Sequence, residues 1–401
     1  MNCGDLLSVV KTRRAGDLLL LLLSRACYRR RVMDAPGNVP DSINCHSCGA
    51  ILDLTGQTGF THVECQHCGA PSVVPLKFGD FLLLNVIGTG GTGTVYKAID
   101  VPLNRYLALK IPRSNLASDP EFVARFSGEA RATATVNHPN VAQVYSFGEI
   151  DHWYYTTMEL CDHGSLDSRI TQLGRLSELE VLSIGLQIAS ALRAAWQHGV
   201  LHRDVKPGNI LFNEDGVPKL VDFSLATAQG SDRESTQMAA ADQIWGTPYY
   251  VAPEKLRGKS DDERSDIYSL GATLFHALAG RPPADPPSPT DAVAKHAVAP
   301  AAFLATDAPA TQPRTIRIIT RMLAQDPAER YGSYDELIND LMEAQDLLKK
   351  TPLAASGHKR FAALYLVGAL LFCAGVVWFV WKYGVADFQP TRPPVPAHTA
   401  P

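Results

Sequence analysis

Positive charge is in short supply along this chain. Its 401 residues include 37 Lys and Arg against 41 Asp and Glu, which gives a formal net charge of −4. Proteins that hold nucleic acids or acidic membrane surfaces by charge need clustered cations. The overall balance therefore offers no signal for either class.

A second shortage is local. No Lys or Arg occurs between Cys45 and Cys68, a segment that holds four of the eight cysteines. The cysteines form two pairs, Cys45 with Cys48 and Cys65 with Cys68, and a glycine follows each pair. Sixteen residues separate the pairs, a spacing typical of zinc sites with four cysteine ligands. The sequence predicts a zinc ribbon over residues 42–72 with all four sulfurs as ligands, and the missing cations argue against nucleic-acid binding by it.

So short a ribbon buries little apolar surface, and bound Zn²⁺ would have to supply its folding free energy. Disulfide bonds are the alternative use of these cysteines. His46 and His67 lie inside the two pairs, and either could replace a thiolate as ligand. We expect the ribbon to dock a protein partner or to regulate the rest of the chain.

Charge of either sign is missing from Phe361 to Trp381, a run of 21 residues. At about 1.5 Å per residue a helix of this length covers roughly 32 Å, close to the hydrocarbon thickness of a bilayer. The basic segment 349–360 precedes it, and only Lys382 and Arg392 follow. These features predict a transmembrane helix over 361–381, with everything before it in the cytoplasm and the short Pro-rich tail 382–401 outside. A buried core helix is the alternative.

The first 41 residues allow two interpretations. Six leucines, Leu18 to Leu23, precede Arg29 to Arg31, but the apolar run is short for a signal peptide and no small-residue cleavage site is evident. Residues 1–41 are either a disordered or weakly membrane-associated leader, or a stretch that lies largely upstream of the true start at Met33.

The run from His202 to Leu211 carries the chemistry. It places a carboxylate, an ammonium and an amide, those of Asp204, Lys206 and Asn209, within six residues. Such groups can accept a hydroxyl proton, neutralise a moving phosphoryl group and hold a metal ion. The run resembles the catalytic loop of the eukaryotic-like, or bacterial Hanks-type, Ser/Thr protein kinases. The resemblance implies Asp204 as the base, Lys206 as the neutralising charge and Asn209 as a magnesium ligand.

Other segments resemble the same family and follow in its order. A glycine-rich turn lies between two apolar stretches that predict strands, and the resemblance implies that it covers the phosphates of ATP. A dinucleotide-binding loop is the alternative, but that fold needs a helix directly after the glycines. The residues of the turn are Ile87, Gly88, Thr89, Gly90, Gly91, Thr92, Gly93, Thr94 and Val95.

Two charged residues complete the nucleotide side of the pattern. Lys110 lies within the predicted strand Leu107–Ile111. Glu129 lies on a predicted helix, whose start is indicated by a capping residue, Asp119, and by Pro120 in the first turn. By resemblance, Lys110 grips the α- and β-phosphates and Glu129 orients it. The alternative for each is a solvated surface charge.

The hinge and the second metal ligand are implied in the same way. Glu159 and Cys161 follow Met158 and resemble the hinge that receives adenine through backbone groups, with Met158 as gatekeeper. Cys161 is interpreted as a packed residue and not a reactive thiol. Asp222 resembles the aspartate whose Mg²⁺ bridges the β- and γ-phosphates. Ser224 replaces the family's usual glycine, which puts the movement of this segment between active and inactive forms in doubt.

Substrate type and regulation are also implied. Lys206 and the segment Gly246–Glu254 resemble the Ser/Thr-specific form of the family, in which Glu254 pairs with Arg330 and Asp266 braces the catalytic loop. Arg203 precedes the base, as in kinases whose arginine meets a phosphate on the activation segment.

The activation segment lies between Asp222 and Glu254 and includes Ser231, Ser235 and Thr236. We hypothesise autophosphorylation of Ser235 or Thr236, in a dimer, which orders the segment through hydrogen bonds to Arg203. A merely flexible loop is the alternative.

The resemblance as a whole implies an α+β, two-lobed protein kinase fold over residues 81–348, with a small β-rich N-lobe and a larger helical C-lobe. It implies transfer of the γ-phosphate of ATP, with Mg²⁺ or Mn²⁺, to Ser or Thr of protein substrates. A pseudokinase scaffold that acts through binding only is the alternative, and the retained Lys110, Asp204 and Asp222 argue against it.

Overall fold

The computed structural model describes residues 37–91, 93–113, 119–223, 248–258, 261–283, 304 and 306–350, together with residues 374, 375, 378 and 382. Thr92, Ser224 and the predicted phosphorylation sites lie outside these residues, as do most of the leader and nearly all of the predicted span 361–381. The chain divides into two compact units, Met1–Gln345 and Asp346–Pro401. Among the described residues, no helix is both long and apolar enough to cross a membrane.

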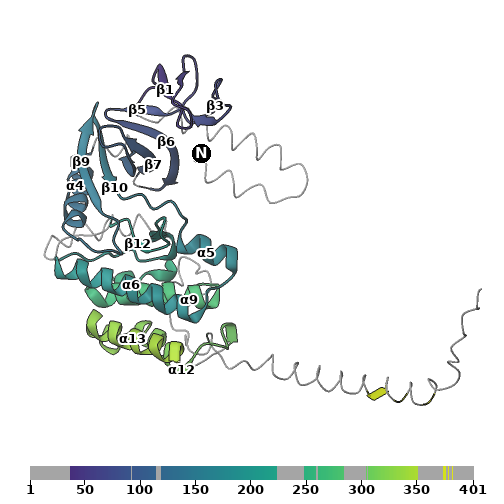
Figure 1. Ribbon diagram of the computed structural model, residues 1–401. Helices are drawn as coiled ribbons and strands as arrows, with labels where there is room; N and C mark the ends of the chain where they lie inside the picture. Colours follow the sequence, from purple (N-terminus) through teal and green to yellow (C-terminus); the bar gives the residue numbers. More distant parts are fainter. Residues whose placement is uncertain are drawn as a thin grey trace, which may run out of the picture. The chain divides into compact units, whose positions relative to one another are not determined.

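Six antiparallel strands form the sheet of the smaller lobe (Figure 1). Their spatial order is β5-β6-β7-β8-β10-β9, so the last hairpin is the only departure from chain order. The glycine-rich turn joins β6 to β7, which confirms the predicted strand–turn–strand. The strands are β5 (Leu76–Phe78), β6 (Phe81–Thr89), β7 (Gly93–Asp100), β8 (Arg105–Pro112), β9 (Val144–Ile150) and β10 (Trp153–Met158).

Alternation along β8 separates the two faces of this sheet. Leu107, Leu109 and Ile111 are buried together in the apolar core of one face. Lys110 lies between them in sequence and therefore projects from the opposite face. Val95 of β7 pairs with Lys110, which places the end of the glycine-rich turn beside the lysine.

Helix α4 (Pro120–Ala134) packs beside β9. Asp119 caps it by accepting the backbone N–H of Glu121 at 3.0 Å, as the sequence predicts. Phe126 is buried, and its ring centroid lies 5.8 Å from that of Phe147 in β9. This packing fixes the rotation of the helix and directs Glu129 toward β8.

Helices dominate the larger lobe (Figure 1). Helix α9 is buried along most of its length because α6 and α12 pack against it. Helix α6 ends just before Gly199, whose φ of +75° suits glycine. The elements are α5 (Leu166–Leu173), α6 (Glu178–Gln197), η1 (Pro207–Asn209), β11 (Ile210–Phe212), β12 (Pro218–Leu220), η2 (Pro248–Tyr250), α8 (Pro253–Leu256), α9 (Glu263–Ala279), α12 (Pro313–Met322), η3 (Pro327–Glu329) and α13 (Tyr334–Lys350).

Two short hairpins precede the sheet. They are β1 (Ser42–Asn44) with β2 (Ile51–Asp53), and β3 (His62–Glu64) with β4 (Pro71–Val73). Each hairpin turns through one cysteine pair, and Gly49 and Gly69 close these turns at φ values of +75° and +72°. A side chain with a Cβ resists that left-handed conformation, which explains the glycine after each pair.

The hairpins are built onto the smaller lobe. Phe60 lies between them, yet it belongs to the apolar core of the six-stranded sheet, where its ring stacks on that of Tyr96 at 6.0 Å. Val39 packs against both this core and the core around the cysteines. Only Val74 and Pro75 separate β4 from β5, so the chain passes directly from ribbon to sheet.

Candidate active site

Two hydrogen-bonded pairs form the centre of the site. Lys110 Nζ lies 2.8 Å from Asp222 Oδ1, although 112 positions separate these residues in sequence. Asn209 Nδ2 donates to Asp204 Oδ2 at 2.9 Å. The backbone joins the two pairs, because the N–H of Val221 donates to the carbonyl of Asn209 at 3.0 Å. The structure therefore brings all four predicted residues into one region between the lobes.

The short η1 turn holds the catalytic loop in shape. Asn209 Nδ2 also donates to the backbone carbonyl of Asp204 at 2.8 Å, and Lys206 Nζ donates to Asp204 Oδ2 at 2.6 Å. The Asp204 carboxylate is thus held by a cation and an amide that the sequence places two and five residues further on. The ion pair places a carboxylate beside the ammonium of Lys206, the combination that proton acceptance next to a phosphoryl group needs.

Lys110 has a second carboxylate partner in Glu129, with Nζ and Oε1 3.6 Å apart. Burial opposes the charge on Lys110, but the nearby Asp222 and Glu129 outweigh it and raise its pKa. Burial raises the pKa of Glu129 to about 7, with Lys110 opposing the shift. Asp222 is the closer of the two carboxylates to Lys110, so we conclude that it contributes more to keeping the lysine charged. Burial is the larger influence on Glu129 and raises its pKa.

Asp222 has an unusual backbone conformation. Its φ of +63° falls in the left-handed region that non-glycine residues seldom occupy. Such conformations cost about 1–3 kcal/mol and persist where the surroundings enforce them. The carboxylate of Asp222 and the amide oxygen of Asn209 are oxygen ligands of the kind that Mg²⁺ prefers. Nδ2 of Asn209 faces Asp204, which turns the amide oxygen away from the base.

His202, for which the sequence predicts no separate role, links the catalytic loop to the segment that contains Asp222. Its ring is fully buried, Nε2 lies 3.1 Å from the carbonyl of Val221, and the ring of Phe223 is 4.5 Å away. Asp266 Oδ2 accepts the backbone N–H of His202 at 2.8 Å. Burial lowers the pKa of His202, so the ring is neutral at pH 7 and serves as a polar spacer. Its position in the family motif was the available signal.

The segment from Glu159 to Cys161, which resembles the family's hinge, follows β10 directly. The backbone N–H of Glu159 donates to the backbone carbonyl of Gln143 at 2.8 Å, so this N–H already has a partner within the chain. The Glu159 carboxylate pairs with Lys219 Nζ at 2.6 Å. Cys161 is buried, and burial raises the pKa of its thiol to about 12, which agrees with a packed residue and not a nucleophile.

At one position of the glycine-rich turn, only glycine fits for steric reasons. A Cβ on Gly93 would lie 2.4 Å from the carbonyl oxygen of Ile111 in the neighbouring strand. A Cβ on Gly90 or Gly91 would meet no atom within 4 Å. Gly93 is therefore required by strand packing, whereas Gly90 and Gly91 keep the turn open to a close-lying ligand.

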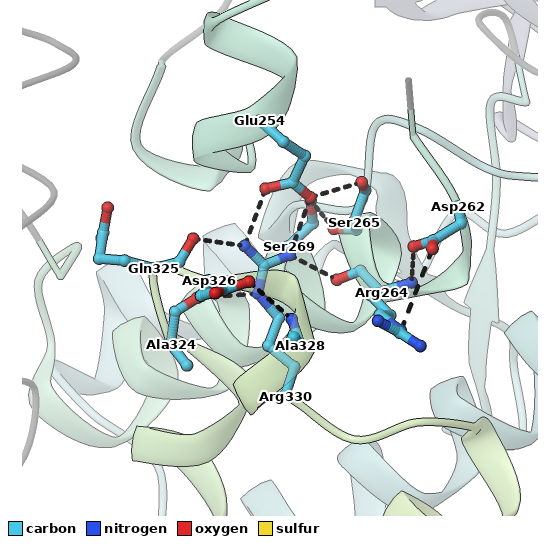
Figure 2. A network of polar contacts seen from close by, with 10 residues as sticks. All are labelled: Glu254, Asp262, Arg264, Ser265, Ser269, Ala324, Gln325, Asp326, Ala328 and Arg330. Atoms are coloured by element: carbon cyan, nitrogen blue, oxygen red, sulfur yellow. Dashed lines mark hydrogen bonds and ion pairs between the residues drawn. The ribbon is translucent and has the colours of Figure 1, made fainter. Parts of the chain in front are cut away.

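Beneath the site, Glu254 and Arg330 form the predicted ion pair (Figure 2). Both oxygens of the carboxylate accept from the guanidinium at 2.8 Å, and the Arg330 side chain is completely buried. Ser265 Oγ adds a hydrogen bond to Glu254 at 2.6 Å, and Arg330 also donates to the carbonyls of Arg264 and Ala324. Burial opposes ionisation of Glu254, but Arg330 outweighs it and lowers the pKa of the carboxyl.

The four cysteine sulfurs of the ribbon form a separate cluster. All lie within 4.8 Å of one another, and Cys45–Cys68 and Cys48–Cys65 are 3.7 Å apart. Four sulfurs around one zinc ion at about 2.3 Å would be separated by roughly 3.8 Å along each edge of the tetrahedron. A disulfide needs about 2.05 Å, so the observed spacing fits the metal and not the alternative. His46 and His67 do not belong to this cluster.

Residues 81–345 match the family model of the protein kinase domain. The match covers more than half of the chain, and the chain therefore belongs to the protein kinase family. This confirms the predicted α+β, two-lobed fold.

Relatives of known type are serine/threonine-protein kinases of bacteria. The chain is 38% identical over 268 residues to the serine/threonine-protein kinase PrkC of Bacillus subtilis, an alignment that spans 67% of this chain and 41% of that protein. It is 36% identical over 269 residues to the serine/threonine-protein kinase PknA of Mycobacterium tuberculosis, spanning 66% of this chain and 61% of that protein. The chain thus matches less than two thirds of the length of either relative.

A solved structure agrees with these sequence relatives. The crystal structure of the PknI kinase domain from Mycobacterium tuberculosis is 29% identical in sequence, with a TM-score of 0.52. The superposition covers 67% of this chain and 98% of the other. The ribbon and the segment 349–401 fall outside the family match.

Proposed function

We propose that this protein transfers the γ-phosphate of ATP to Ser or Thr hydroxyls of protein substrates. One observation carries the proposal: Lys110, Asp204, Asn209 and Asp222 come from three segments and lie around one region, linked by hydrogen bonds of 2.8 to 3.0 Å. A scaffold that only bound partners would not need to hold a base, a metal-ligand pair and a phosphate-binding lysine in register.

Each residue has a distinct task in the proposed transfer. Asp204 accepts the proton of the attacking hydroxyl, and Lys206 neutralises charge on the transferred group. Lys110, held by its carboxylate partners, binds the nucleotide phosphates. Asn209 and Asp222 would hold Mg²⁺ or Mn²⁺, which supplies charge neutralisation at the phosphate oxygens. The hinge carbonyl of Glu159 and the backbone of Cys161 would orient adenine.

The test is a radiolabelled-ATP assay on the full chain with D204N. Base catalysis contributes about 10²- to 10⁴-fold, so labelling by D204N should fall by that factor while nucleotide binding persists. The matched control is D335N, because Asp335 is an aspartate paired with Arg193 on the exposed surface. Equal labelling by wild type and D204N would reject the transfer and leave the scaffold hypothesis.

The four cysteines are proposed to bind one structural Zn²⁺. The ion would hold the two hairpins together. The core around the cysteines contains only five buried residues, so the metal would have to supply much of the folding free energy. The fit of the sulfur spacing to a zinc tetrahedron supports this proposal. Metal analysis of the purified protein should find one zinc per chain, and C45S should abolish it.

Zinc binding is further proposed to support the smaller lobe of the kinase. Phe60 lies between the two hairpins and packs in the core of the sheet, so loss of the folded hairpins should disturb this packing. Regulation of the kinase by the ribbon thus has a physical route through Phe60 and Tyr96. Ile51 is 75% exposed on β2, and the absence of Lys and Arg between the cysteine pairs favours a protein as docking partner over a nucleic acid.

Membrane attachment remains a proposal based on sequence. The uncharged run 361–381 and the basic residues before it support a single span with the kinase and ribbon in the cytoplasm. Fractionation of cells that express the full chain tests it. Release of the protein from membranes by alkaline carbonate would contradict an integral span.

A further inference from the structure

Arg203, directly before the proposed base, is held by the larger lobe through its backbone and its side chain. Its backbone N–H donates to Asp266 Oδ1 at 2.8 Å, and its carbonyl accepts from Lys255 Nζ at 2.9 Å. Its φ of +67° lies in the left-handed region. An arginine in that conformation needs external contacts to persist, and the residue it positions is Asp204.

The side chain of Arg203 is held by a carboxylate. Its Nε lies 2.9 Å from Asp261 Oδ2, and its Nη2 lies 3.3 Å from Asp261 Oδ1. The two nitrogens and two oxygens form the forked, two-bond arrangement that arginine makes with carboxylates and phosphates alike. Only 14% of the Arg203 side chain and 18% of the Asp261 side chain is exposed, so the pair is screened little by solvent.

We propose that Asp261 is a positioning residue for catalysis, which supplies from within the folded chain the negative charge that Arg203 requires. Asp261 is part of the folded chain, so Arg203 has a carboxylate partner before any phosphate is added to the activation segment. Phosphorylation of the activation segment is then not required for turnover. This inference rests on the proposed kinase activity and specifies how it is regulated.

Charge and reach are the properties that Asp261 contributes. Asp266 already holds the backbone of His202 and Arg203, but it does not bond to the guanidinium in these contacts. Asp261 lies five residues earlier, in the connection between α8 and α9, and reaches Arg203 through its side chain. Replacing Asp261 by Asn keeps the size and removes the charge, whereas Glu keeps the charge and changes the reach.

The experiment compares full-length wild type, D261N, D261E and D335N, each before and after phosphatase treatment, with phosphate content measured by intact mass. We expect dephosphorylated wild type to keep its kcat within about twofold. Dephosphorylated D261N should lose about tenfold in kcat at an unchanged KM for ATP, less than the loss of the base itself. D261E should recover most of the loss, and D335N, the surface ion-pair control, should match wild type.

Three outcomes would overturn the inference. One is a dephosphorylated D261N with wild-type kcat. Another is a dephosphorylated wild type that loses as much activity as D261N. The third is loss of nucleotide binding by D261N, because that would show a general structural role and not positioning of the base. A wild type that transfers no phosphate at all would instead reject the proposed kinase function.

Discussion

The catalytic loop and the cysteine ribbon are stabilised by opposite means. Around the loop, buried charges hold the backbone directly, as Asp266 does for His202 and Arg203 and as Arg330 does for Arg264 and Ala324. The ribbon has five buried residues in its own core and four sulfurs arranged for an ion. The first region is held by contacts between its own residues, whereas we propose that the second needs a bound metal ion and its contact with the sheet.

The largest expected effect is that of zinc removal. Structural zinc contributes about 10–16 kcal/mol of apparent binding free energy in small Cys-rich modules, so a strong chelator should unfold residues 42–72 while the larger lobe stays folded. Hydrogen exchange of the full chain measures this, region by region. C45S should reproduce the result and C161S, a buried cysteine outside the ribbon, should not. Unchanged protection of the ribbon in chelator would remove the contrast.

Loss of the buried ion pair comes next. R330M strands the Glu254 carboxylate in the interior, so it should lower the free energy of unfolding by about 3–5 kcal/mol. Urea denaturation provides the measurement. D335N breaks an exposed pair and should cost no more than about 1 kcal/mol. Similar losses in the two variants would mean that burial does not set the value of these pairs.

Phe60 tests the contact between the two regions. F60A should cost about 3 kcal/mol, at the low end for buried aromatic residues, because Phe60 lies at the edge of the sheet's core. F60L keeps most of the volume and should cost less than about 1.5 kcal/mol. If both variants retain zinc and only F60A has a raised KM for ATP, the contact of Phe60 is what couples the ribbon to ATP binding. A wild-type unfolding midpoint for F60A would show that ribbon and lobe are separable.

The smallest effect concerns pH. Burial raises the pKa of Glu129 from 4.5 to about 7. Between these values the folded protein binds more protons at this site than the unfolded chain does, so its contribution to stability falls as pH rises from 4.5 to 7. The slope is at most about 1.4 kcal/mol per pH unit. Chemical denaturation of wild type and E129Q across this range should show the difference, and parallel curves would contradict it.

Sequence was most informative where function is local. Asp204, Lys206 and Asn209 lie within six residues, so the chain itself brings them together, and the cysteine spacing sets the sulfur cluster in the same way. The pairing of Lys110 with Asp222 spans 112 positions and came only from resemblance to a family. No periodicity in the sequence could have supplied it.

Other contacts were missed because they depend on tertiary structure. Phe60 looks like an ordinary loop residue between two cysteine pairs, and its place in the core of the sheet is set by β5 and β7. Asp261 lies in an acidic stretch that predicts a solvated surface, yet it meets an arginine 58 positions earlier. The activation segment and the predicted span lie outside the described residues, so those predictions stand as predictions.

The two-residue connection between β4 and β5 has a mechanical consequence. Val74 and Pro75 leave no slack between ribbon and sheet, and proline stiffens the joint further. The ribbon is therefore not expected to turn independently of the sheet. A protein bound to the ribbon would act on the smaller lobe through this joint, away from the residues of the candidate site.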